Sequence, residues 1–267
     1  MLVFYASTAV EASNVQASAY STKAINDSIK IYLELIKENQ YKEPRLSLEF
    51  AYRAIVLSKK SKDEQAQAEL YSALGDVYFE MAIYDKALKA YSDALSQCSN
   101  AEESLFAGQC LSNMGKTYCK MGIYSLALKN FRLAASLYNE EEHLQELSLA
   151  YTHIGHAYAC MEEHDQAMQY FNDVLDLPED QLPDDTRART YSYIGDVFSA
   201  RGNLPLSQDF YRRSLRIFSS LGDTLSHADI ELKLGDNKLQ EADHDAALRH
   251  YGSAAEMLEK GHFYHDL

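Results

Sequence analysis

Apolar residues recur along most of the chain at the spacing of an amphipathic helix, in segments that come in pairs. In the first clear pair, Tyr71, Leu74, Gly75 and Tyr78 stand at positions i, i+3, i+4 and i+7, on one face of a helix. A second stripe of small and aromatic residues follows around Tyr91. Only 4 prolines and 11 glycines interrupt the 267 residues, so long helices are expected. The pattern predicts an all-α fold of paired helices.

Glycines mark a repeat, because Gly75, Gly115, Gly155, Gly195 and Gly235 are each 40 residues apart. An aromatic residue stands 16 residues after all five glycines, and an alanine or serine stands 12 residues after each. A glycine inside a helix costs about 0.5–1 kcal/mol relative to alanine. Its return at one position in five units therefore predicts a close backbone contact there.

This pattern resembles the tetratricopeptide repeat family, whose marks are an aromatic residue, Leu-Gly and Tyr on a first helix, and Ala, an aromatic and Ala on a second. One unit carries every mark, in Tyr71, Leu74, Gly75, Tyr78, Ala87, Tyr91 and Ala94. The resemblance covers residues 64 to about 260, and more weakly the chain from about residue 24. It implies a right-handed α-solenoid of about six stacked antiparallel helix pairs, whose concave face usually binds a protein or peptide.

The period of 40 residues exceeds the roughly 34 usual in this family, and the extra residues lie before the first helix of each unit. We expect first helices of about 18–20 residues after a short loop. Gly122 and Gly202 indicate turns within units, and Pro44 and Pro205 suit the first turns of second helices. A single repeat domain is predicted over residues 24–267. Its units are expected at about 24–63, 64–103, 104–143, 144–183, 184–223 and 224–260.

Both ends depart from the repeat. Leu35 stands where a glycine is expected, so the first unit is interpreted as degenerate. Residues 262–267 are expected to start a further first helix. With no polar capping helix after it, this end is predicted to pair with a second copy of the chain, or to be cut from a longer protein. Residues 1–23 are interpreted as an N-terminal arm or, because Val10-Glu11-Ala12 fits a cleavage rule, as a signal-peptide remnant.

The charge balance narrows the choice of partner. The chain has 40 acidic and 25 basic residues, a formal net charge of -15. This disfavours nucleic acid, which needs a basic footprint over its phosphates, and it disfavours docking on an anionic membrane surface. No apolar run is long enough for a helix that spans a bilayer, so no membrane insertion is expected within this chain.

Little in the sequence points to catalysis. No Gly-rich phosphate loop, Gly-x-Ser-x-Gly elbow or His-Glu-x-x-His motif is found, so we expect neither an enzyme nor a cofactor or metal. His153 and His156 stand one helical turn apart and could share a metal, although groove histidines facing solvent are the simpler interpretation. Cys119 and Cys160 occupy nearly equivalent places in neighbouring units, which leaves a disulfide as the alternative to free thiols.

The concave face is the more informative surface. Helical spacing assigns to it the positions −6, −3, −2, +1, +4 and +5 relative to each repeat glycine. In the middle of the array these positions carry amides, histidines, lysines and an arginine, while acids gather towards both ends. The predicted partner-binding groove comprises Asn113, Lys116, Lys120, His153, His156, Arg189 and Tyr193. The Asn113 amide would hold a ligand backbone, and the three cations would hold carboxylate of an acidic segment. Alternatively, these charges only balance neighbouring helices.

Three functions follow from the resemblance. The first is a non-catalytic protein- or peptide-binding scaffold, and the second is the sensory domain of a longer bacterial signalling protein with a kinase or diguanylate cyclase module. A peptide-pheromone receptor that regulates phosphatases ranks last, because that class carries a helical bundle before its repeats and residues 1–23 are too short for one. Localisation stays open between the cytoplasm, the default, and an extracytoplasmic compartment if residues 2–12 end a signal peptide.

Overall fold

The computed structural model describes residues 24–61, 63–98, 104–140, 143–178 and 180–263, and every regular element in these ranges is helical. The predicted all-α class of stacked helix pairs is confirmed. A helix over residues 24–39 precedes α2 (Pro44–Ser61). The following helices are α3 (Glu64–Glu80), α4 (Tyr84–Ser96), α5 (Ser104–Lys120), α6 (Tyr124–Glu140), α7 (Leu144–Cys160), α8 (His164–Leu175), α9 (Asp184–Ala200), α10 (Leu204–Leu221), α11 (Thr224–Gln240) and α12 (His244–Phe263).

The first helices of the repeats keep the period seen in the sequence. Helices α3, α5, α7, α9 and α11 are each 17 residues long, and each begins 40 residues after the one before. They are slightly shorter than the expected 18–20 residues, because capping residues fix where the first turn begins. The Asp63 carboxylate accepts the backbone N–H of Ala66, and Asp223 accepts that of Ser226 in the same way.

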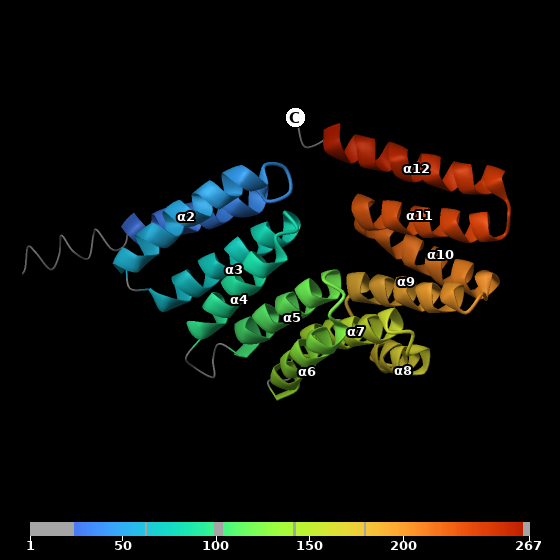
Figure 1. The fold of residues 1–267 in the computed structure, drawn as a ribbon, viewed down its shortest axis with the longest axis horizontal. Helices are drawn as coiled ribbons and strands as arrows, with labels where there is room; N and C mark the ends of the chain where they lie inside the picture. The colour runs from blue at the N-terminus through green and yellow to red at the C-terminus, as the bar shows by residue number, and fades with distance from the viewer. Residues whose placement is uncertain (1–23, 62, 99–103, 141–142, 179, 264–267) are drawn as a thin grey trace, which may run out of the picture. The chain divides into compact units, whose positions relative to one another are not determined.

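The helices form two compact units, which meet after Thr117 inside α5 and are described separately. In unit 1 the helix over residues 24–39, α2, α3 and α4 lie side by side with the greater part of α5 (Figure 1). Its core comprises Ile36, Ala54, Leu70, Val77 and Tyr91, all at most 1% exposed. In unit 2, α7 packs on α6, α8 and α9, and α11 packs on α10 and α12.

The repeat glycines make room for an aromatic ring. A methyl group added at Gly155 would lie 2.5 Å from the ring of Phe171, sixteen residues further on. Gly75, Gly195 and Gly235 meet the rings of the residues sixteen positions after them at the same distance. The predicted close contact is therefore present, but it joins the first-helix backbone to a side chain of the second helix, not backbone to backbone.

The turn within each repeat needs a left-handed residue seven positions after the repeat glycine. Gly122 and Gly202 have φ angles of +73° and +75°, which confirms their predicted place in turns. Ala82, Glu162 and Ala242 hold the same position in the other units, with φ between +56° and +63°. A side chain at such an angle is strained, so three of the five turns are not optimal for stability.

The two ends of the described chain differ from the regular repeat. In the first pair, Leu35 stands in the place of the glycine and the fully buried Ala51 in the place of the ring, so the large and small residues are exchanged. At the other end, α12 continues through Gly261 to Phe263. Residues 262–263 therefore extend the last helix, which corrects the expectation that a new helix starts there. Residues 264–267 and the signal-like segment within 1–23 lie outside the described part of the chain.

Candidate protein-interaction surface

A regular contact joins neighbouring first helices within each unit, α3 to α5 in unit 1 and α7 to α9 and α9 to α11 in unit 2. The residue directly after one repeat glycine meets the residue two positions before the following repeat glycine. In unit 1 the Asp76 carboxylate accepts a hydrogen bond of 3.2 Å from the Asn113 amide. In unit 2, the His156 ring stacks on Tyr193 with centroids 4.2 Å apart, and Asp196 lies 2.9 Å from Lys233 Nζ. The groove positions are therefore paired between neighbouring repeats.

In unit 1 the Asp76 carboxylate is the centre of a polar cluster. It accepts hydrogen bonds from the Tyr91 hydroxyl at 2.8 Å and from the Asn113 amide. Burial raises the pKa of Asp76, whereas the Tyr91 hydrogen bond and the charges of Lys116 and Lys37 oppose that rise. A cleft of about 280 Å³ opens beside it, lined by Gln40, Tyr41, Asp76, Phe79, Glu80, Tyr91, Asn113 and Lys116. The predicted residues Asn113 and Lys116 thus share one cleft wall with an acid.

In unit 2 the predicted histidines and tyrosine lie on the aromatic rings of the repeats. The His153 ring stacks on Phe131 at 5.2 Å, and Tyr193 stacks at 6.2 Å on Phe171. The His156 ring stacks on Tyr193, and its Nε2 lies 3.5 Å from Cys160 Sγ. His153 and His156 therefore contact different neighbours, Phe131 and Tyr193.

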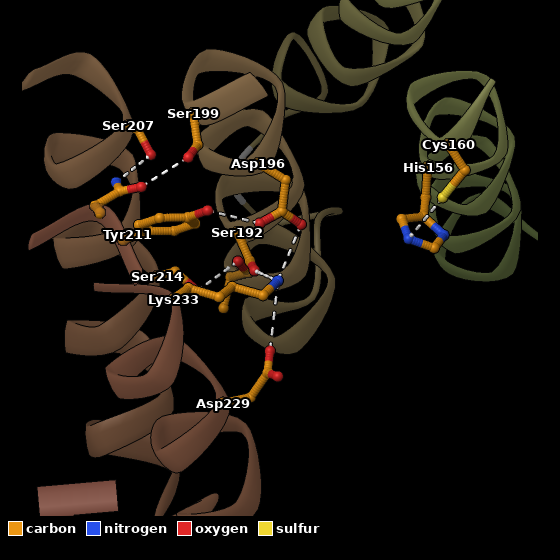
Figure 2. A network of polar contacts seen from close by, with 12 residues as sticks. His156, Cys160, Ser192, Asp196, Ser199, Ser207, Tyr211, Ser214, Asp229 and Lys233 are labelled. Atoms are coloured by element: carbon orange, nitrogen blue, oxygen red, sulfur yellow. Dashed lines mark hydrogen bonds and ion pairs between the residues drawn. The ribbon is translucent and has the colours of Figure 1, made fainter. Parts of the chain in front are cut away.

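Lys233 is held by two carboxylates on the same surface (Figure 2). Its ammonium group lies 2.9 Å from Asp196, 3.4 Å from Asp229 and 2.9 Å from Ser192 Oγ. Burial lowers its pKa, but the two carboxylates outweigh that effect and raise the pKa of Lys233. The Tyr211 hydroxyl donates to Asp196 at 2.7 Å, so this carboxylate has several partners. The positive charge of Lys233 is therefore balanced by carboxylates of the protein itself.

Electrostatics at the centre of unit 2 differ from a simple positive patch. Burial lowers the pKa of His156 to about 4, with a small opposing effect of Asp196 and lowering effects of Lys233 and Lys120. His156 is therefore neutral near pH 7 and offers a hydrogen bond without a charge. Burial raises the pKa of Tyr193, although the charges of Lys233 and Arg189 oppose that rise. Lys120 and Arg189 remain as the predicted cations that lie close to this aromatic pair.

Sequence reasoning missed a correlation between two positions of the repeat. Where a tyrosine stands sixteen residues after the repeat glycine, the residue directly after the glycine is aspartate. The tyrosine hydroxyl donates to that aspartate at 2.7–2.8 Å in Tyr91–Asp76, Tyr211–Asp196 and Tyr251–Asp236. Where phenylalanine replaces the tyrosine, the position after the glycine carries Lys116 or His156. A hydroxyl inside the groove requires an acceptor, so this signal was readable in the sequence.

The predicted groove contains more acidic side chains than the sequence suggested. Asp76 contacts Asn113, and Asp196 contacts Lys233, so each acid lies against a predicted groove position. The structure brings Asn113 and Lys116 together in unit 1. In unit 2 it brings together His156 and Tyr193, and places Lys120 and Arg189 close enough to influence the pKa values of this pair.

A family model described as "Tetratricopeptide repeat" matches residues 66–140, 107–180 and 186–260. The chain belongs to the tetratricopeptide repeat (TPR) family. No curated protein sequence matches it.

Solved TPR-like structures share the fold at low sequence identity. The chain is 16% identical to a Rap protein in complex with competence and sporulation factor, with a TM-score of 0.70 over 89% of this chain and 65% of that one. It is 13% identical to NprR bound to its cognate peptide NprX, with a TM-score of 0.68 over 87% and 67%. It is 14% identical to the apo form of RapI, with a TM-score of 0.65 over 87% of this chain and 98% of that one. These likenesses establish the fold alone.

In the part of the TPR chain that the structure describes, no group of three or more His, Cys, Asp or Glu side chains could hold a metal ion. Cys98, Cys110, Cys119 and Cys160 are free thiols. Burial raises the pKa of Cys110 and that of Cys119 to about 12, so neither is a reactive thiolate near pH 7. None of the described helices is both long and apolar enough to cross a membrane.

Proposed function

We propose that this TPR chain is a non-catalytic module that binds a peptide segment of a partner protein on the first-helix face of unit 2. The observation that carries the proposal is the His156–Tyr193 stack, at 4.2 Å, with Lys120 and Arg189 close to it. An aromatic platform beside cations suits a peptide that presents an apolar side chain next to a carboxylate. The platform is partly exposed, since His156 and Tyr193 each keep a minor part of their surface accessible to solvent.

Acidic character is proposed for the partner segment because of the two cations. Neither Lys120 nor Arg189 has an ion-pair partner among the described residues, whereas Lys233 is already held by Asp196 and Asp229. A partner carboxylate would therefore meet a guanidinium and an ammonium whose charges are not neutralised by contact. Neutral His156 would add a hydrogen bond and His153 would flank it, so the attraction depends on Lys120 and Arg189.

In unit 1 a second contact is proposed at the cleft beside Asp76. The Asn113 amide nitrogen donates one of its two hydrogens to Asp76, so its second N–H and its carbonyl oxygen would be the groups that bind a ligand backbone. Lys116, which is exposed on the same helix face, would reach a carboxylate at the cleft edge.

Two proteins of similar fold hold a ligand in their solved structures, the Rap protein in complex with competence and sporulation factor and NprR in complex with its cognate peptide NprX. What they bind is a property of those proteins. Their likeness to this chain supports a peptide as the class of ligand, because stacked first helices form a long concave face that matches an extended or helical segment.

A displayed library of random peptides, selected on the purified chain, tests the proposal. We expect recovered peptides to be enriched in aspartate and glutamate next to an apolar residue. Replacing those acids with the corresponding amides should weaken binding roughly tenfold or more, and added salt should weaken the parent peptide more than the amide version. Recovery of basic peptides, or of peptides whose affinity does not depend on their acids, would contradict the proposed partner.

A further inference from the structure

Leucines are exposed in a row on the last two helices, α11 and α12. Leu232 and Leu239 of α11 are 39% and 50% exposed, and Leu248 and Leu258 of α12 are 68% and 38% exposed. Leu225, 65% exposed, continues the row on α11 at the same seven-residue spacing. Seven residues are close to two helical turns, so these side chains share one face of α11. We call the five residues the leucine stripe.

On α11 the leucine stripe occupies positions that earlier repeats use to pack on their successors. Leu232 corresponds to Thr152 of α7 and Ser192 of α9, counted from the repeat glycine. Thr152 Oγ1 lies 2.9 Å from Thr190 Oγ1 of the next first helix, and Ser192 Oγ accepts from Lys233 Nζ of α11 at 2.9 Å. Small polar residues at this position therefore contact the following helix, whereas α11 presents a leucine.

On α12 the same relation holds. Leu248 corresponds to Gln208 of α10, which is buried and donates to Glu241 of the following repeat at 2.8 Å. Leu258 corresponds to Phe218, which is 2% exposed and packs with Ile230 of the following repeat. The leucine stripe thus continues the stacking interface of the array. Its apolar side chains would bury well only against another apolar helix face.

Charges around the leucine stripe decide which helix fits. Asp229 and Asp236 lie one turn from Leu232 and Leu239 on α11, and Asp245 lies one turn before Leu248 on α12. All three aspartates are exposed. In a two-fold pair of α11 helices centred on Leu232, Asp229 of one copy would lie beside Asp236 of the other. Repulsion between these acids disfavours a second copy and favours a helix with basic flanks.

We propose that the leucine stripe is a docking site for an amphipathic helix of a partner protein, with an apolar face bordered by lysine or arginine. Such a helix would lie along α11 and α12 where a further repeat would stack, its apolar residues covering the leucines and its cations facing Asp229, Asp236 and Asp245. Leu232 and Leu239 stand at positions −3 and +4, which belong to the concave positions of the repeat. This interface differs from the proposed peptide contact on unit 2 in its place along the array, because it lies on α11 and α12 and not beside His156 and Tyr193.

The test uses two synthetic helical peptides of roughly 14 residues with the same leucine face, one flanked by lysines and one by glutamates. Their fluorescence anisotropy is followed as the full chain is added. We expect the lysine peptide to bind and the glutamate peptide to bind at least roughly tenfold more weakly. The double variant Leu232→Ser/Leu239→Ser should lose at least roughly tenfold in affinity for the lysine peptide. Serine stands at both equivalent positions of α9, Ser192 and Ser199, so these substitutions suit the fold.

A matched variant separates the leucine stripe from general attraction to an acidic protein. Leu126 and Leu133 of α6 are 39% and 47% exposed, and Leu126→Ser/Leu133→Ser should leave the affinity for the lysine peptide unchanged. Equal losses in the two double variants, or none in either, would overturn the proposal. So would a dimer in light scattering that Leu232→Ser/Leu239→Ser converts to monomers, because a second copy would then cover the leucine stripe. Circular dichroism of each variant establishes that the helices are intact.

Discussion

Replacing Gly155 with alanine tests the contact that sets the spacing of the helix pairs. The added methyl carbon would lie 2.5 and 2.7 Å from two carbons of the Phe171 ring. Since carbon atoms pack at roughly 3.5–4 Å, the ring has to move by about 1 Å. Phe171 is fully buried, so no free space receives it. Overpacking of this kind costs about 1–3 kcal/mol, and the gain in helix propensity offsets about 0.5–1 kcal/mol. A net destabilisation of about 1–2 kcal/mol is expected.

Urea unfolding followed by circular dichroism measures this change as a shift of the midpoint. For Gly155→Ala we expect the midpoint to fall by roughly 0.5–1 M, given typical slopes. Gly252→Ala is the matched control, because a methyl group there meets nothing within 4 Å in the middle of α12, and it should raise the midpoint. In Gly155→Ala/Phe171→Leu, part of the loss from each substitution should be recovered, as a coupling of about 1 kcal/mol. A Gly155→Ala variant as stable as Gly252→Ala would refute the reasoning.

Three further predictions concern the turns, His156 and the ion-paired Lys233. Because Glu162 has a φ of +63°, Glu162→Gly should raise the free energy of unfolding by about 0.5–1 kcal/mol. Gly202→Ala, at a φ of +75°, should lower it by a similar amount, and urea unfolding measures both changes. The pKa of His156 is about 4 in the folded protein, below its unfolded value of about 6.5. The stability that neutral His156 contributes should therefore decline as the pH falls from about 6.5 towards 4. NMR titration of the ring should find no protonation above about pH 5. Lys233→Gln should cost about 1–3 kcal/mol and Asp229→Asn, at a carboxylate 61% exposed, less than about 0.5, a ranking that thermal unfolding checks.

The repeat units were predictable because their signals are local. A helix pair buries its own stripe, so the spacing of Gly155, Tyr158, Ala167 and Phe171 reports directly on one unit and recurs in the next. Gly202 and Pro205 marked a turn and a helix start for equally local reasons, a left-handed φ and a fixed φ in the first turn.

The pairing of groove residues was not predicted because it depends on contacts between units. Helical spacing placed His156 and Tyr193 on the concave side, but their stacking follows from how far α9 is shifted along α7. The same holds for Asp196, whose contacts with Lys233 and Tyr211 depend on how the neighbouring helices pack. Only the recurrence of aspartate with tyrosine, in Asp196 and its counterparts, carried a readable signal for such contacts.

Binding of a selected acidic peptide to charge-reversed variants tests the proposed interaction surface most directly. Isothermal titration compares Lys120→Glu/Arg189→Glu, beside the His156–Tyr193 stack, with Lys129→Glu/Arg212→Glu, two exposed cations on the second helices α6 and α10. Both variants change the net charge equally. We predict that the first loses at least roughly a hundredfold in affinity and the second less than about threefold. Equal affinities of the two variants would contradict a partner site on the first-helix face of unit 2.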